Sequence, residues 1–98
     1  MPYMIEAWDA PNQAAQRQAI RPVHLEYLAR HAPFLLACGA KLTEDGSTAT
    51  GSFYIVDTDV REEAQRFIEG DPFHGAGVFG RVVLTRWRKS YLDGRSYL

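Results

Sequence analysis

Residues 34–56, FLLACGAKLTEDGSTATGSFYIV, contain the pattern that decides the fold of this chain. Two apolar runs, Phe34–Leu42 and Gly51–Val56, flank a short segment rich in Thr, Asp, Gly and Ser. Apolar runs of this length bounded by turn residues are typical of strands, and the segment between them favours antiparallel pairing. The stretch therefore predicts a β-hairpin, around which the rest of the chain completes a sheet.

A helix is expected on the N-terminal side of this hairpin, preceded by a strand. Tyr3–Asp9 mixes aromatic and β-branched residues before a turn, which predicts the strand. Good helix formers follow in Gln13–Ile20, and because proline suits the first turn of a helix, we expect a new helical segment from about Pro22 to His31. Its apolar face is formed by Leu25, Leu28, Ala29 and Ala32.

A second helix and a last strand are expected on the C-terminal side. Asp59 and Glu62 have the spacing of a capping box, so the helix begins near Asp59 and ends at Gly70. Its apolar stripe is formed by Val60, Ala64, Phe67 and Ile68. The last strand is predicted at about Val78–Arg88. The order β-α-β-β-α-β is the ferredoxin-like arrangement of the α+β class.

The predicted strands carry apolar residues on both faces. Two helices can cover only one face of a four-stranded sheet, so the other face should turn polar if it meets water. Strict alternation applies within each strand. It places Phe34, Leu36 and Cys38 opposite Leu35 and Ala37, it places Phe53 and Ile55 opposite Tyr54 and Val56, and it places Phe79, Val83 and Trp87 opposite Val82 and Leu84. We therefore expect a second copy of the chain to cover the open face and form a homodimer.

Length, charge and cysteine content limit the class of protein. Ninety-eight residues support one domain, expected to span residues 1–98. The net charge of −1 argues against a general nucleic-acid binder. A single cysteine, Cys38, offers no internal disulfide, which fits a reducing compartment. No run is long and apolar enough for a signal peptide or a membrane span. A cytoplasmic protein without a membrane partner is the expectation.

Two residues stand out as candidates for chemistry. His24 follows Pro22 closely, so the expected helix puts its ring in the first turn, where the helix dipole disfavours the protonated ring. Asp71 lies between Gly70 and Pro72. Each also has an ordinary structural interpretation, because a histidine can simply pack in the interior and an Asp-Pro pair is often a helix N-cap.

The two motifs around these residues are similar to those of a known family. Arg21-Pro22-x-His24-Leu25, Gly70-Asp71-Pro72-Phe73 and Ala76-Gly77-Val78-Phe79 resemble the YCII-related (YciI-like) family of the dimeric α+β barrel superfamily. The resemblance spans nearly the whole chain. It implies two ferredoxin-like units whose sheets meet as a barrel, and it places His24 and Asp71 in a His-Asp dyad at the mouth of a cleft.

The resemblance implies proton-transfer chemistry on a small cyclic or aromatic molecule, as in an isomerase or in a lyase such as a dehydrochlorinase. A carboxylate that binds one imidazole nitrogen fixes the tautomer and makes the other nitrogen a general acid/base. Arg21 could hold a carboxylate or phenolate, or form a surface salt bridge. Phe73 and His74 could line the pocket or simply pack. The alternatives to an enzyme are a ligand-binding accessory dimer that does not catalyse and a purely structural dimer.

Several other signals fail on their spacing. Gly75–Gly80 matches GxGxxG but leads into a strand, where a dinucleotide motif needs a helix. His24 and His31 are seven residues apart on one helix, about 10 Å, which is too far to share a metal ion. Arg86–Lys89 interleaves tryptophan with basic residues but is too brief to indicate RNA binding. We therefore expect no cofactor, no metal and no nucleic acid.

Overall fold

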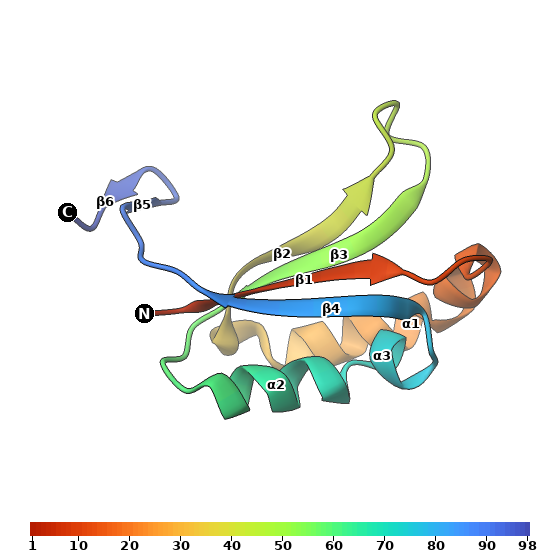
Figure 1. The fold of residues 1–98 in the computed structure, drawn as a ribbon, viewed down its shortest axis with the longest axis horizontal. Coiled ribbons are helices and arrows are strands. Elements are labelled where there is room, and N and C mark those ends of the chain that lie inside the picture. The colour runs from red at the N-terminus through yellow and green to blue at the C-terminus, as the bar shows by residue number, and fades with distance from the viewer.

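The computed structural model describes all of residues 1–98 and has the α+β, ferredoxin-like arrangement that the sequence predicts (Figure 1). The elements are β1 (Tyr3–Asp9), α1 (Ala14–Arg30), the 3-10 helix η1 (Ala32–Phe34), β2 (Leu35–Leu42), β3 (Ala49–Val56), α2 (Arg61–Gly70), α3 (Pro72–Gly75), β4 (Phe79–Arg86), β5 (Tyr91–Leu92) and β6 (Arg95–Ser96). The main sheet has the order β2-β3-β1-β4, and all its pairings are antiparallel.

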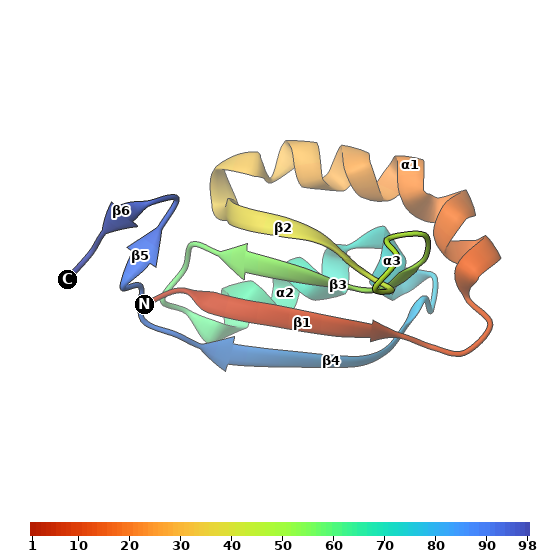
Figure 2. The same cartoon turned by 90° about the horizontal axis from the view of Figure 1, so that it is seen from above.

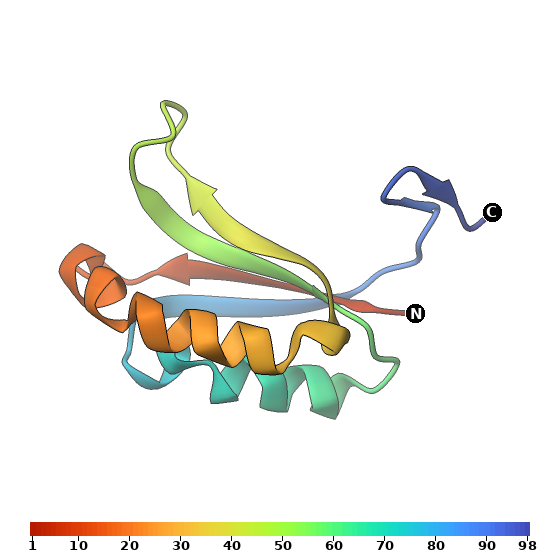
Figure 3. The same cartoon turned by 180° about the vertical axis from the view of Figure 1, so that it is seen from behind.

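The molecule has two layers, with the helices on one face of the sheet and nothing over the other (Figures 1 and 3). Seen from above, α1 runs along the β2 edge and α2 lies beneath the centre of the sheet (Figure 2). The buried cluster between the layers consists of Tyr3, Ile5, Tyr27, Tyr54, Val56, Ala64, Phe67 and Ile68. None of the helices has the length and apolar character needed to cross a bilayer.

The first helix is longer than predicted. The expected start at Pro22 is wrong, because α1 begins at Ala14 and carries Pro22 inside it. Pro22 is exposed, so its ring and its missing N–H are on the solvent side, while packing on the opposite side holds both halves of the helix. His24 therefore lies in the middle of α1, and the argument from the helix dipole does not apply to it.

The buried face of α1 also differs from the predicted one. Leu25 is 43% exposed, whereas the buried residues of the helix are Arg17, His24 and Tyr27. Leu28 is partly buried against the core. The side of the helix that faces the sheet is thus largely polar. The spacing of apolar residues therefore could not identify this side as the buried one.

The second helix ends at Gly70 as predicted but is not capped as predicted. Asp59 makes no capping bond and instead pairs with the N-terminal amine of Met1. The Val60 backbone N–H donates to Oγ1 of Thr58 at 3.0 Å, and the Thr58 hydroxyl donates to Glu63. The expected capping box is therefore replaced by a threonine that lies one residue earlier.

Two strand irregularities change which side chains share a face. The pairing of β2 with β3 shifts register between Leu35 and Ala37, and that of β1 with β4 shifts between Trp8 and Asp9. Leu35, Cys38 and Phe79 consequently all pack against the core, together with Val82 and Leu84. The predicted assignment of Leu35 and Cys38 to opposite faces is wrong, and so is that of Phe79 to the face opposite Val82 and Leu84.

The open face of the sheet is mixed rather than purely apolar. Phe53 and Ile55 face this side, since Tyr54 and Val56, which are predicted to oppose them, lie in the core. At one end Lys41 lies 3.9 Å from the Trp8 ring centroid and 3.2 Å from a carboxylate oxygen of Glu6. Gly51 makes room for the Lys41 chain, because a Cβ there would lie 2.5 Å from Lys41 Cε and 2.2 Å from Ala7 O.

Candidate active site

His24 and Asp71 are in direct contact across the helical layer. Nδ1 of His24 lies 2.8 Å from Oδ1 and 3.0 Å from Oδ2 of Asp71. His24 comes from the middle of α1, and Asp71 comes from the junction of α2 and α3. The carboxyl group is fully buried, so the contact is shielded from water. Nε2 of His24 forms no hydrogen bond within the chain, and this atom is accessible to solvent.

Asp71 accepts further hydrogen bonds that fix its position. The Tyr54 hydroxyl donates to Oδ2 at 2.8 Å, and the Phe73 backbone N–H donates to Oδ1 at 2.8 Å. Asp71 is thus the N-cap of α3, with Pro72 in the first turn, as well as the partner of His24. One carboxylate caps the helix and contacts His24, because different donors approach its two oxygens.

Tyr54 is held as a hydrogen-bond donor. Burial, followed by the charge of Asp71 and the hydrogen bond to it, raises the pKa of the Tyr54 hydroxyl well above its ordinary value. Burial and Asp71 also raise the pKa of the nearby Cys38 thiol. Both groups therefore remain protonated at neutral pH, and Cys38 is not an activated nucleophile.

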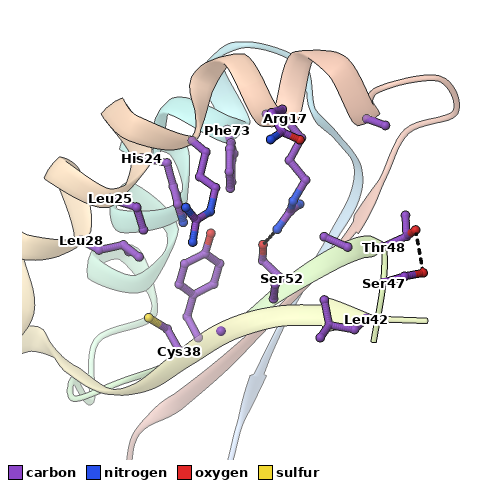
Figure 4. A pocket seen from close by; sticks show the side chains of 17 residues that line it. Arg17, His24, Leu25, Leu28, Cys38, Leu42, Ser47, Thr48, Ser52 and Phe73 are labelled. Atoms are coloured by element: carbon purple, nitrogen blue, oxygen red, sulfur yellow. Dashed lines mark hydrogen bonds between the residues drawn. The ribbon is translucent and has the colours of Figure 1, made fainter. Parts of the chain in front are cut away.

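Phe73 lies between His24 and a third side chain, Arg17 (Figure 4). The rings of His24 and Phe73 are stacked, with centroids 3.9 Å apart and planes inclined by 15°. Cζ of Arg17 lies 4.6 Å from the Phe73 ring centroid. Phe73 is 1% exposed, so its contacts are with these protein groups rather than with solvent.

Arg17 is buried and held by hydrogen bonds on several sides. Its Nη1 donates to Asp9 Oδ1 at 2.8 Å, and its Nη2 donates to Ser52 Oγ at 2.8 Å and to Gly51 O at 3.0 Å. Only 8% of the residue is exposed. Such a network fixes the orientation of the guanidinium, whereas a flexible arginine at the surface has no fixed orientation.

Four of these residues line one cavity between α1 and the β2–β3 hairpin, namely Arg17, His24, Tyr54 and Phe73 (Figure 4). Its volume of about 750 Å³ suits a small organic molecule. The polar wall includes Arg17, Arg21, His24, Ser52 and Tyr54. The apolar wall includes Leu25, Leu28, Cys38 and Leu42. No three His, Cys, Asp or Glu side chains lie close enough together to share a metal ion.

Comparison with known proteins identifies the family. The model of the YCII-related domain matches residues 1–88. The chain belongs to the YCII-related family. This YCII-related chain is 30% identical to Protein YciI of Escherichia coli O6:H1 and of Shigella flexneri, over 93% of its own length and 100% of theirs. Among solved structures it is similar to 5-chloro-2-hydroxyhydroquinone dehydrochlorinase (TftG) from Burkholderia phenoliruptrix AC1100, crystallised with 2,5-dihydroxybenzoquinone. The TM-score is 0.82 at 30% identity, and the match covers 90% of this chain and 94% of TftG.

The residues that the sequence singled out lie in different places in this YCII-related fold. Arg21 is exposed and lines the cavity beside His24. Phe73 also lines it, although its ring contacts His24 and Arg17. His74 is exposed on α3 and does not line the cavity. Of the predicted set, His74 alone lies away from the cavity and from the His24–Asp71 contact.

Sequence reasoning missed Arg17, Ser52 and Tyr54. Arg17 precedes His24 by seven residues, or two helical turns, so it shares the face of His24 on any continuous helix. The expected break at Pro22 hid this relation. Ser52 and Tyr54 alternate onto the helix side of β3, a position that the strand pattern gives, but nothing in the sequence shows that a carboxylate approaches there.

Proposed function

We propose that this chain is an enzyme that transfers a proton to or from a small cyclic or aromatic molecule, with His24 as the general acid/base. The observation that carries the proposal is the fixed imidazole. Asp71 holds Nδ1, Nε2 has no hydrogen-bond partner within the chain, and His24 lines the cavity. A ring held in this way presents one tautomer to the ligand, which is what efficient proton transfer requires.

The reaction begins when neutral Nε2 of His24 accepts a proton from the substrate. The electron pair of the broken bond then forms a new double bond. In an isomerisation His24 returns the proton to another atom of the same molecule. In an elimination a leaving group such as chloride departs with its bonding pair, and His24 releases the proton afterwards. Asp71 stabilises the imidazolium that exists between the steps and does not itself need to take the proton.

The structural relative supports the elimination form of this proposal. TftG is named as a dehydrochlorinase, an enzyme that removes hydrogen chloride, and it was crystallised with a six-membered ring compound. The cavity of the present chain has the size for such a ring. We assign Arg21 to binding an oxygen of the substrate, because its guanidinium is exposed at the cavity and has no ion-pair partner within the chain.

We also propose that the chain works as a homodimer whose contact surface is the open face of the sheet. Phe53 and Ile55 remain half-buried there although no element of the chain covers them. Covering apolar side chains by a second copy removes them from water. Sedimentation should then give a species of twice 11.1 kDa at micromolar concentration. A species of 11.1 kDa alone would contradict the dimer without touching the proton-transfer proposal.

The experiment that tests the enzyme is the His24→Ala variant with His31→Gln as a matched control. His31 directly follows the last residue of the same helix, and its ring packs on Tyr27 outside the cavity. Turnover of 5-chloro-2-hydroxyhydroquinone, followed as chloride release, should fall by about 10²-fold or more in His24→Ala, with ligand affinity nearly unchanged. The His31→Gln variant should keep its activity. Loss of affinity in His24→Ala, with no turnover by the unmodified protein on any ring substrate, would identify a ligand-binding protein instead.

A further inference from the structure

We propose that Arg17 is a second fixed ligand-binding group and that the site takes small organic oxyanions, carboxylates or ionised enols, in preference to neutral molecules. This inference rests on the proposed function for the location of the ligand. It concerns what binds rather than what reacts. The sequence singled out Arg21 alone for this role, whereas the structure provides a buried arginine with a fixed orientation.

First, Arg17 has N–H donors that the rest of the chain does not use. A guanidinium carries five N–H bonds. Arg17 uses three of them, for Asp9 Oδ1, Ser52 Oγ and Gly51 O. Two N–H bonds remain, and Arg17 lines the cavity. A buried charged group whose orientation is already fixed loses little entropy when it binds a ligand, so its remaining donors favour an anionic partner.

The second argument is the sign of charge along the cavity wall. The wall includes two arginines and His24 but no aspartate or glutamate. The two carboxylates nearby do not line the cavity, because Asp9 pairs with Arg17 and Asp71 with His24. Arg21 adds a guanidinium that no acidic residue of the chain neutralises. A ligand in the cavity therefore meets N–H donors, while the negative groups already accept hydrogen bonds from the protein.

The third argument is the spacing of the two fixed groups. Arg17 and His24 are seven residues apart, which corresponds to about 10.5 Å along a helix. Both side chains contact the Phe73 ring, so the His24 ring and the Arg17 guanidinium are closer together than this distance along the helix. A single ring can thus place an oxygen at Arg17 and a proton-bearing atom at Nε2 of His24. Proton loss at one end increases the negative charge at the other, where Arg17 stabilises it.

The test compares an acid with its neutral ether. The hydroxyl groups of 2,5-dihydroxybenzoquinone are ionised enols at neutral pH, whereas 2,5-dimethoxybenzoquinone has the same ring and no ionisable group. Binding is measured by calorimetry in the Cys38→Ser background, because a free thiol in the cavity could add to a quinone. The dihydroxy compound should bind at least about tenfold more tightly than the dimethoxy compound. Equal affinity, tighter binding of the ether, or no binding of either would overturn the inference.

Variants of α1 assign the preference to Arg17. The Arg17→Gln variant should weaken binding of the dihydroxy compound by about tenfold and change that of the ether by less than about twofold. Arg30→Gln is the matched control, since it removes the same charge from the same helix outside the cavity. If Arg17→Gln does not fold, Arg17→Lys takes its place. The lysine retains a cation without the planar donor fork and should weaken binding of the dihydroxy compound by a smaller factor. Unchanged binding in the Arg17 variant that folds would exclude this role.

The two proposals can fail separately. Selective binding of the acid that depends on Arg17, without turnover of any ring substrate, would contradict the proposed enzyme activity and support the anion-binding site. Turnover that depends on His24, with no preference for the acid and no effect of Arg17, would do the opposite. The binding measurements therefore require no assumption about the reaction.

Discussion

The Tyr54 hydroxyl donates a hydrogen bond of 2.8 Å to Oδ2 of Asp71, from the side of the carboxylate away from the helix cap. This bond joins the central sheet to the residue that holds His24. A buried carboxylate without such donors would be costly, since an unsatisfied buried acceptor loses about 1–3 kcal/mol. The sheet thus supports the contact between His24 and Asp71 through one hydroxyl.

Replacing Asp71 by Asn should reduce proton transfer far more than it reduces stability. An amide nitrogen at this position can only donate, so it would select the wrong tautomer of His24 or lose the contact. We expect the rate of the chemical step to fall by about 10²-fold or more. A chloride-release assay beside thermal unfolding checks this. A variant that keeps its activity while folded would show that the carboxylate serves only as a helix cap.

Removal of the Tyr54 hydroxyl should change the response of the protein to alkaline pH. The pKa of Tyr54 is raised above the ordinary 10.0, so its contribution to stability is complete below pH 10.0 and is lost as the pH rises above that value. In that range one proton contributes about 1.4 kcal/mol per pH unit to the free energy of unfolding. Urea unfolding at pH 9 and pH 11 should show a steeper loss in the unmodified protein than in Tyr54→Phe. Parallel curves would contradict the assignment.

Phe73→Leu should loosen the side chains of His24 and Arg17 at once. The substitution keeps the residue apolar but removes the ring on which His24 and Arg17 rest. We expect a loss of about 1–3 kcal/mol of stability. NMR should show broadening or shifts of the His24 ring and of the Arg17 side chain together. A Phe79→Leu control removes a ring at the edge of Phe73 and should leave the His24 signals in place.

Gly51→Ala should destabilise the sheet where a comparable change nearby does not. A Cβ at Gly51 would approach the backbone oxygen of Ala7 to 2.2 Å, and the strand must shift to relieve the clash. At Gly39 the nearest atom is in the Phe53 ring at 3.2 Å, which a small rotation can accommodate. We expect a loss of about 2 kcal/mol or more for Gly51→Ala and clearly less for Gly39→Ala, measured by denaturant unfolding. Equal losses would show that β3 moves freely at this point.

The order of elements could be predicted from the sequence because strand and turn signals are local. The hairpin 34–56, the strand Tyr3–Asp9 and the end of α2 at Gly70 all depend on residues within a few positions of one another. Strand bulges do not have such a signal. The irregularities at Leu35 and at Trp8 are set by how two strands fit together, and the one at Trp8 accompanies the position of Phe79 on the same side as Val82 and Leu84 instead of the opposite one.

The site could be predicted in part, for a related reason. His24 and Asp71 occur in short motifs, and their side chains meet in the structure. Arg17 was missed because hydrophobic periodicity finds the buried face of a helix only when that face is apolar. Here the periodicity pointed to Leu25, which lines the cavity and is exposed. Arg17 can lie on the buried face because Asp9 and Ser52 accept hydrogen bonds from its guanidinium, and this relation depends on the folded structure.

The polar inner face of α1 also constrains how this domain can evolve. Buried ionic groups can often be exchanged for apolar residues of similar volume with no loss, or with a gain of about 1–4 kcal/mol in stability. At the positions of Arg17 and His24, selection for stability therefore opposes selection for the proposed function. A variant with leucines on this face would be a more stable domain whose cavity has neither the imidazole nor the buried guanidinium.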